Sequence, residues 1–407
     1  MSKKTFTLLI ALIIAIIAFL GWFFFFRTTT PVTPGTTQQG TDLFPFGPGS
    51  TSTRPSTPTN SGTSTIDLSN NTPAASLPRL RQLWKDPTAG ATFFPATGTT
   101  TSVRFVDRAT GHIYESPLDA LGNEKISNVT IPQIHEALWA ANGKEVIFRY
   151  LKNDSIIQSF YATLSTTSAS TTSTLEGYFL PANIRDISIS GGKIAYFDPT
   201  LQTGQLIEAR VDGTARKAVM NSEAWDWSIT YNNPKVAFLG TRPSGLVPGF
   251  GYALDMATGA TTRIAGEILG LTGTINASGT KAFLSAQEQQ VIASAAYDIK
   301  TKVTQNLSIR TLSDKCAWSN VKSQLIYCAV PVSLQAGTYP DDWYKGKVSF
   351  TDRLWSIDLS TGETRQLLDP SFEVLQDMDI MKIVIDRTDS SLTFINKNDM
   401  SLWLYRP

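Results

Sequence analysis

The sequence predicts an all-β fold, a seven-bladed β-propeller, and three observations support that prediction. A hairpin pattern recurs in which a tight turn of Asn, Gly or Ser ends in Lys between two apolar runs; such turn residues tolerate positive φ. The turn lysines recur 49, 42, 46 and 41 residues apart, near the roughly 40–45 residues of a four-stranded blade. They are Lys144, Lys193, Lys235, Lys281 and Lys322. A second turn, beginning with Asp, recurs at 255–259, 298–302 and 358–362 and supports the register.

The N-terminal region is expected to anchor the chain in a membrane. Residues 5–26 carry no charge and are long enough, at about 1.5 Å per residue, to cross a bilayer core of about 30 Å. The alternative is a cleaved signal peptide, although its apolar region would normally be shorter and end in small residues. Lys3 and Lys4 precede the span and Arg27 follows it, so residues 1–4 are expected in the cytoplasm. The predicted localisation is therefore the cell membrane, single-pass, with the propeller in the periplasm or outside the cell.

A linker is predicted for residues 27–78. The segment is dominated by Thr, Ser, Pro, Gly and Asn, which bury too little apolar surface to offset the entropy of ordering, so we expect it to be disordered. Phe44 and Phe46 form an apolar island within it. We consider this island a candidate docking motif, with an incidental apolar cluster as the alternative.

The domain from residue 79 to 407 can be laid out as hairpin after hairpin. Six predicted blades occupy 91–131, 134–180, 184–220, 225–265, 268–307 and 315–368. Three strands then remain, at 381–386, 392–396 and 401–405. Leu80–Trp84, ahead of the first blade, has no partner in this layout and can complete the seventh, which leaves no open seam in the ring. Six or eight blades are the alternatives.

The sequence of the recurring hairpin also resembles that of a known family. The pattern Trp-x-x-Asn-Gly-Lys-x-apolar-x-Phe at Trp139–Phe148, with weaker echoes at 318–327 and 276–283, resembles the repeat of TolB-type, WD-repeat-like propellers. The resemblance covers residues 79–407 and implies the fold, whereas propellers host unrelated activities. TolB-type repeats usually have Pro-Asp-Gly in the turn, which this chain lacks, so TolB-like partners are not implied.

No catalytic motif is found. Neither Gly-x-Ser-x-Gly nor His-Glu-x-x-His occurs, and His112 and His135 have no partner at metal-ligand spacing. The acidic pairs Asp341–Asp342 and Asp377 with Asp379 offer two carboxyl groups for glycoside hydrolysis, but adjacent acids in loops are usually solvated. With two Cys and two His, the chain is short of the four ligands of a structural zinc site. No metal and no cofactor are expected.

The interpretation that follows is a non-enzymatic, membrane-anchored extracytoplasmic module that binds a protein or an envelope polymer. A formal charge of +1 gives no basis for nucleic-acid binding. Two alternatives stay open: a propeller hydrolase or lyase acting on glycans or peptides, and a structural subunit of an envelope, secretion or pilus assembly. A buried acidic cluster with raised pKa values at the ring axis would favour an enzyme, and a wide apolar face would favour binding.

Two groups of candidate site residues follow from the strand layout. Cys316 and Cys328 fall opposite each other on neighbouring strands, where Cα atoms about 4.5 Å apart permit a disulfide; two buried free thiols are the alternative. Two long loops, 241–250 and 331–350, are predicted on one face, pointing away from the membrane. Their aromatic residues are candidate partner anchors, unless the loops plug the channel: Phe250, Tyr339, Trp343, Tyr344 and Phe350.

Overall fold

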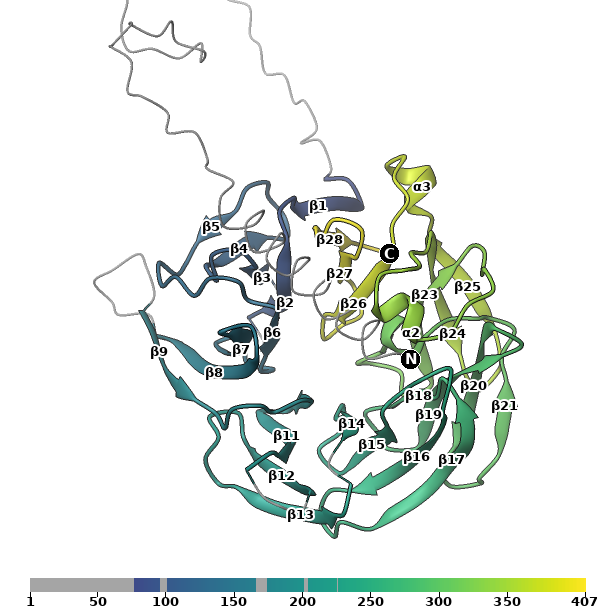
Figure 1. The fold of residues 1–407 in the computed structure, drawn as a ribbon. Helices are drawn as coiled ribbons and strands as arrows, with labels where there is room; N and C mark the ends of the chain where they lie inside the picture. The colour runs from purple at the N-terminus through teal and green to yellow at the C-terminus, as the bar shows by residue number, and fades with distance from the viewer. Residues whose placement is uncertain (1–76, 96–100, 166–173, 201–203, 225) are drawn as a thin grey trace, which may run out of the picture. The chain divides into compact units, whose positions relative to one another are not determined.

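The computed structural model describes residues 77–95, 101–165, 174–200, 204–224 and 226–407. These residues form seven four-stranded antiparallel sheets arranged in a ring, which confirms the predicted all-β, seven-bladed propeller (Figure 1). In the first six sheets the first strand along the chain lies innermost, and innermost strands of adjacent sheets contact one another around most of the ring. The candidate anchor at 5–26, the linker up to residue 76, and Phe44 and Phe46 lie outside the described residues. No helix in the described ranges is long and apolar enough to cross a membrane.

The first three blades follow the chain in order. Blade 1 holds β2 (Thr88–Phe94), β3 (Ser102–Asp107), β4 (Ile113–Pro117) and β5 (Glu124–Lys125). Blade 2 holds β6 (Glu136–Trp139), β7 (Glu145–Lys152), β8 (Ile156–Ser165) and β9 (Thr174–Phe179). Blade 3 holds β10 (Ile187–Ser190), β11 (Lys193–Asp198), β12 (Gly204–Arg210) and β13 (Lys217–Ser222).

Blades 4 to 6 include the short helices. Blade 4 holds β14 (Trp227–Thr230), β15 (Val236–Thr241), β16 (Pro248–Asp255) and β17 (Thr261–Leu269). Blade 5 holds β18 (Thr272–Ile275), β19 (Lys281–Glu288), β20 (Val291–Asp298) and β21 (Thr304–Asn306). Blade 6 holds β22 (Cys316–Trp318), β23 (Leu325–Pro331), β24 (Asp352–Asp358) and β25 (Thr364–Leu368). The helices within the described residues are η1 (Ser313–Lys315), α2 (Asp341–Tyr344) and α3 (Pro370–Glu373).

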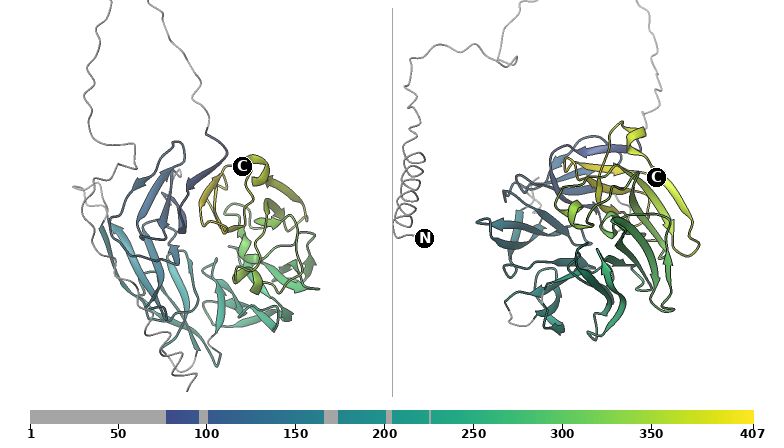
Figure 2. Two further views of the ribbon diagram at one scale, coloured as in Figure 1. Left: turned by 45° about the horizontal axis from the view of Figure 1, so that its top comes forward. Right: turned by 45° about the vertical axis from the view of Figure 1, so that its right-hand side comes forward.

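Blade 7 closes the ring with strands from both ends of the domain. It combines β26 (Ile380–Ile385), β27 (Leu392–Asn396) and β28 (Leu402–Tyr405) with β1 (Leu80–Trp84). β1 pairs antiparallel with β28, as predicted, and the purple β1 lies beside the yellow strands in both figures (Figure 2). Arg81 of β1 donates hydrogen bonds to the carbonyls of Pro117, Leu118 and Ala120 in blade 1. The closing strand is therefore tied to the blade on its other side as well.

The hydrophobic core lies between the blades. One cluster joins Ala195 and Phe197 of blade 3 to Ile229 and Tyr231 of blade 4, and equivalent clusters occupy the other blade interfaces. Because both faces of each sheet are covered, the middle strands read as nearly continuous apolar runs rather than alternating ones. Strand tryptophans such as Trp139 are buried in these interfaces.

Several element boundaries differ from those predicted. Ile268 and Leu269 continue β17 instead of opening blade 5, because a bulge at Glu267 lets the strand run on. Residues 126–131 were expected in the last strand of blade 1, but β5 ends at Lys125. The three short helices lie in segments that carried no helical signal.

One face of the ring, here called the top face, carries the loops that join second to third strands and the segments that lead into each innermost strand. Long loops make it the more elaborate face, and the candidate site lies there.

Candidate functional site

A long loop of blade 6 forms a strap across the top face. It spans residues 332–351, between β23 and β24, and contains α2. Its Tyr339 N–H donates to Gln287 Oε1 of blade 5 at 2.6 Å, and its Asp341 Oδ2 accepts from Gly245 N of blade 4 at 2.7 Å. The strap therefore crosses blade 5 and joins the loop of blade 4, so the two long loops predicted from the sequence contact each other.

The strap buries most of the aromatic residues that the sequence offered as anchors. Tyr339, Trp343 and Phe350 are only 1, 4 and 5% exposed and pack with Ile292 and Leu312. They hold the strap down, and an outward-facing anchor would need surface that they do not have. The expectation that these three residues anchor a partner is therefore corrected, because an aromatic ring is more favourable buried than exposed.

Two of the five aromatic residues are placed differently from these three. Tyr344 is 45% exposed at the end of α2, which lies toward the inside of the ring (Figure 1). Phe250 was expected in a loop but lies half-buried within β16, because that strand begins at Pro248. Only Tyr344 thus retains a largely accessible aromatic ring.

A buried ion-pair cluster lies beneath the strap. Lys315 Nζ lies 2.7 Å from Asp352 Oδ2 and also pairs with Asp379, and all three side chains are 0% exposed. Asp379 accepts hydrogen bonds from Trp343 Nε1 at 2.9 Å and from Phe350 N at 3.2 Å. The cluster therefore joins the strap to the start of blade 7.

The two carboxylates of this cluster are not equivalent. Asp352 Oδ2 also accepts from Ile380 N at 2.6 Å, but its Oδ1 is buried without a partner among the described residues. Burial raises the pKa of Asp352 to about 6, with Asp379 adding to the rise and Lys315 opposing it. An acid whose second oxygen has no donor pays the desolvation cost of its charge. The charge on Asp352 is therefore costly to the folded state.

A second pair of carboxylates lies where innermost strands begin. The Tyr344 hydroxyl donates to Asp314, with its oxygen 3.1 Å from each carboxylate oxygen, and Asp186 Oδ2 accepts from Ile229 N at 2.9 Å. Burial raises the pKa of Asp314, and the charge of Asp186 adds to that rise. Burial likewise raises the pKa of Asp186. The charge of Lys315 opposes the rise at Asp314, and the charge of Arg149 opposes the rise at Asp186, but burial outweighs both.

The side chain of Asp314 reaches solvent although its surroundings desolvate its charge. This combination is expected of a group that faces water from inside a narrow, protein-walled space. Acids of this kind are candidates for binding and for proton transfer.

Another carboxylate at the start of an innermost strand, Glu136, is paired with two cations. Glu136, at the start of β6, lies 2.8 Å from Arg149 Nη1 and 3.1 Å from Lys382 Nζ. Burial alone would raise its pKa, but Lys382 and Arg149 outweigh that effect and lower it to about 2. Glu136 is a structural charge that links blades 2 and 7.

The remaining titratable candidates have local partners. His135 Nδ1 lies 2.9 Å from Arg108 Nη2, and His112 Nε2 lies 3.0 Å from Thr130 Oγ1. Burial lowers the pKa of both histidines. Asp342 caps its own loop by accepting from Thr338 N. Across the described ranges, no group of three Cys, His, Asp or Glu side chains is arranged to hold a metal ion.

Cys316 and Cys328 form a disulfide across β22 and β23. They are directly paired in the register, with Cα atoms 4.1 Å apart, as the predicted hairpin requires. The bridge lies one residue after Lys315, so it fixes the strand that carries the buried cluster.

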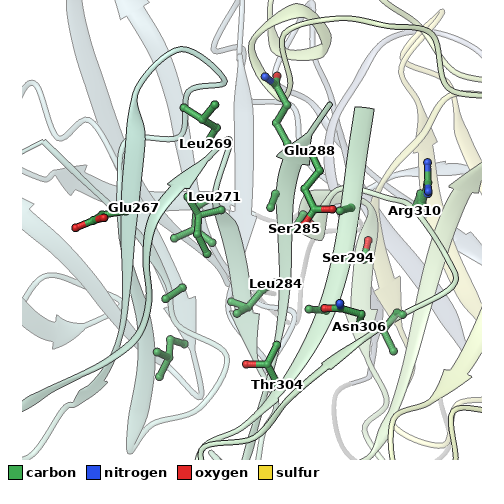
Figure 3. A pocket seen from close by; sticks show the side chains of 18 residues that line it. Glu267, Leu269, Leu271, Leu284, Ser285, Glu288, Ser294, Thr304, Asn306 and Arg310 are labelled. Carbon is green, nitrogen blue, oxygen red and sulfur yellow. The ribbon is translucent and has the colours of Figure 1, made fainter. Parts of the chain in front are cut away.

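A groove opens between the outer parts of blades 4 and 5. Its volume is about 590 Å³, within the roughly 300–1,000 Å³ of ligand pockets. Leu269, Leu271 and Leu284 lie between its two walls, and polar groups stand around them (Figure 3). The labelled polar residues are Glu267, Ser285, Glu288, Ser294, Thr304, Asn306 and Arg310.

The outer strands of blades 4 and 5 differ in length, which leaves space for the groove. β17 runs for 9 residues, whereas β21, the outer strand of blade 5, has only 3. Along β20, Ala293 and Ala295 are half-buried while the residues between and beside them are buried. An apolar floor with a polar rim is the anatomy of a binding surface.

Comparison with known proteins yields the fold and no family. No protein-family model matches the chain, and no curated protein matches it. Among solved structures, it resembles an oligogalacturonate lyase in complex with manganese, with 9% identity, a TM-score of 0.52, and coverage of 82% of this chain and 94% of that chain.

Two further solved structures are similar at lower scores. An oligogalacturonate lyase from Vibrio parahaemolyticus has 9% identity and a TM-score of 0.49, covering 80% of this chain and 91% of that one. TolB from Acinetobacter baumannii has 14% identity and a TM-score of 0.40, covering 64% of this chain and 60% of that one. At these identities the likeness is one of fold, the β-propeller.

Proposed function

We propose that this chain is a membrane-anchored, extracytoplasmic binding module that captures a protein or an envelope polymer. The groove between blades 4 and 5 is the observation that carries this proposal. Its volume of about 590 Å³ suits one side chain cluster or a short polymer segment. Its leucine floor supplies affinity through apolar burial, and its polar rim supplies orientation.

Two features support the location outside the cytoplasm. The uncharged run at 5–26, with Lys3 and Lys4 before it, favours a membrane anchor with the domain outside. The disulfide between Cys316 and Cys328 favours an oxidising compartment, because structural disulfides are rare in reducing cytosol.

The groove is tested by filling it. Ala295 lies on the groove wall and is half-buried, so Ala295→Arg places a long cationic side chain in the groove without removing a core residue. Purified full-length chain is kept in detergent, so that residues 5–26 do not insert into a bilayer, and is sedimented with isolated cell-wall polymer and with bead-coupled envelope proteins. The wild type should co-sediment with one of these fractions, and Ala295→Arg should lose most of that binding.

A matched control separates loss of the groove from a change of surface charge. Leu121 is 76% exposed and distant from the groove lining, so Leu121→Arg adds the same charge elsewhere. It should bind like the wild type. Equal binding by Ala295→Arg and the wild type, with both folded, would overturn the assignment of the groove.

A hydrolase or lyase acting on glycans or peptides is the second candidate function, favoured by one observation. Burial raises the pKa of both Asp186 and Asp314, with the charge of Asp186 adding to the rise at Asp314, and a raised pKa is a property of carboxyl groups that act as general acids. Because an oligogalacturonate lyase shares the fold, oligogalacturonate is one substrate to assay beside other glycans and peptides. Turnover that Asp314→Asn abolishes would support the enzyme, and no turnover of any substrate would leave the binding module as the account.

A further inference from the structure

A small pocket on the top face lies apart from the groove. It is formed where the innermost strands of blades 4, 5 and 6 begin, and its volume is about 40 Å³. A water molecule occupies about 30 Å³ of liquid, so the pocket accommodates one small group. Tyr344 and Asp314 form one side of it, and Thr272 of β18 forms another.

The polar wall of this pocket consists of oxygen atoms. Besides Asp314, six hydroxyl side chains line it, and no Lys, Arg or His is among its lining residues. The hydroxyl residues are Ser228, Thr230, Thr241, Thr272, Ser313 and Tyr344. Gly273 completes the wall, and a Cβ at that position would lie only 2.5 Å from the Phe238 ring. The tight approach of these strands leaves space for a small ligand only.

Hydrogen-bond accounting shows which oxygens lack partners. Thr230 Oγ1 donates to Gly273 O at 3.2 Å, and Thr241 Oγ1 accepts from Phe250 N at 3.0 Å. Thr272, in contrast, is only 5% exposed and its Oγ1 has no partner among the described residues. A buried hydroxyl without a protein partner is costly, so the Thr272 hydroxyl is free to hydrogen-bond to a ligand in the pocket.

The charges around the pocket indicate which kind of ligand it attracts. Asp314 accepts from the neutral phenol of Tyr344 and lies close enough to Asp186 for their charges to interact, with Lys315 behind the pocket wall offsetting part of that negative charge. A cation would therefore be attracted to the pocket, whereas an anion would be repelled. A primary ammonium carries three N–H donors and no acceptor, which matches a carboxylate beside uncharged oxygen acceptors.

We propose that this pocket binds the ammonium group of a primary amine, with Asp314 as the counter-ion and Thr272 Oγ1 as a hydrogen-bond acceptor. The ammonium is carried on a lysine side chain or on an amino sugar, and the rest of that molecule extends toward solvent past the exposed ring of Tyr344. This site goes beyond the groove and does not depend on it.

Binding of small amines to the purified full-length chain tests the proposal. The probes are Nα-acetyl-lysine amide and glucosamine, and their uncharged counterparts are the Nε-acetylated lysine derivative and N-acetylglucosamine. Saturation-transfer NMR should detect at least one amine and neither acetylated compound. The amine that binds identifies the source of the ammonium group.

Two variants locate the bound amine. Asp314→Asn should weaken amine binding roughly 10- to 100-fold, as expected for loss of a charge-assisted hydrogen bond, and Thr272→Val should weaken it several-fold with little change in shape. Asp154→Asn is the matched control, because it removes an exposed carboxylate in another top-face turn, and it should bind as the wild type does.

Three results would overturn the proposal: equal binding of charged and acetylated compounds, unchanged binding in Asp314→Asn, or thermal stabilisation by K⁺ or Na⁺ with none by the amines. If Asp314→Asn does not fold, Thr272→Val alone decides, since it keeps the carboxylate. Loss of envelope binding in Ala295→Arg with amine binding intact would show that the two sites are independent.

Discussion

Replacing Lys315 by Met should cost this domain a large part of its stability. Lys315 Nζ is the cation that Asp352 and Asp379 share, and the three side chains are 0% exposed. Removing it leaves two buried carboxylates without a compensating charge. Breaking a buried ion pair from one side typically costs about 3–5 kcal/mol, against a total stability of about 5–15 kcal/mol for a native protein.

The pH dependence of the variant should identify the cause of the loss. Without Lys315, burying the two carboxyl groups costs less when they are protonated. Folding therefore raises the pKa of each, and stability is regained as the pH falls. Urea unfolding, followed by tryptophan fluorescence from pH 4 to 8, measures this. The gap between Lys315→Met and the wild type should be largest above pH 7 and should narrow toward pH 4.

Lys347→Met supplies the control. That lysine is 67% exposed and lies 3.4 Å from Asp342, a surface pair worth at most about 1 kcal/mol. A loss in Lys315→Met no larger than in Lys347→Met, or a loss that does not change with pH, would refute the view that this cluster holds the strap.

Four further changes have predicted outcomes in the same unfolding assay. Burial raises the pKa of Asp352 from 3.8 to about 6, so the stability contributed by its protonated form is full below pH 3.8. About 3 kcal/mol of that stability is lost as the pH rises toward 6, and Asp352→Asn should remove this pH dependence. The pKa of Glu136 is lowered from 4.5 to about 2, so the stability that its charge contributes is present above pH 4.5 and lost as the pH falls toward 2. Glu136→Gln should abolish this pH-dependent loss of stability, which is at most about 3 kcal/mol. Replacing Cys316 and Cys328 by Ala opens a 12-residue separation and should cost about 3 kcal/mol. Arg81→Met removes charged donors to three carbonyls and should cost about 2–4 kcal/mol.

Each of these predictions has an outcome that contradicts it. The prediction for Asp352 fails if Asp352→Asn keeps the wild-type pH dependence of stability between pH 4 and 6. The prediction for Glu136 fails if Glu136→Gln keeps it between pH 2 and 4.5. Reduction of the wild type by dithiothreitol must match the double Cys variant, because both remove the same crosslink. Arg81→Met contradicts the closure role if it unfolds at the same urea concentration as an exposed-site control such as Arg365→Met.

The fold was readable from sequence because one pattern repeats. Each blade buries both faces, and the first hairpins of blades 2 to 6 have turns rich in Gly, Asn or Ser, so a similar sequence recurs in five consecutive blades. Gly143 and Gly279, both in recurring turns, have φ of 64° and 70°, as the turn chemistry requires. Leu80–Trp84 was assigned to blade 7 because a ring leaves no unpaired edge.

The site was less readable because it depends on contacts between distant segments. The strap buries Trp343 against Asp379, and nothing local in the sequence reports a contact between residues so far apart. One pattern in the sequence does indicate the site. An acidic residue stands at the start of the innermost strand in several blades, as with Glu136, Asp186 and Asp314, and ring topology brings such positions to one face.

The groove gave no sequence signal for a different reason. It arises from the difference in length between β17 and β21, and strand ends are set by a bulge at Glu267, which adopts φ of 60°. A positive φ at Glu is not favoured by the residue itself, so tertiary packing determines it.

Site-specific photocrosslinking in intact cells tests the central claim, that the groove between blades 4 and 5 binds an extracytoplasmic partner. A photoreactive amino acid at Glu288, which is exposed on the groove rim, is compared with the same amino acid at Leu121. We expect one discrete adduct from Glu288, none from Leu121, and loss of the adduct when Ala295→Arg fills the groove. Identical adducts from both positions, or an adduct that survives Ala295→Arg, would contradict it.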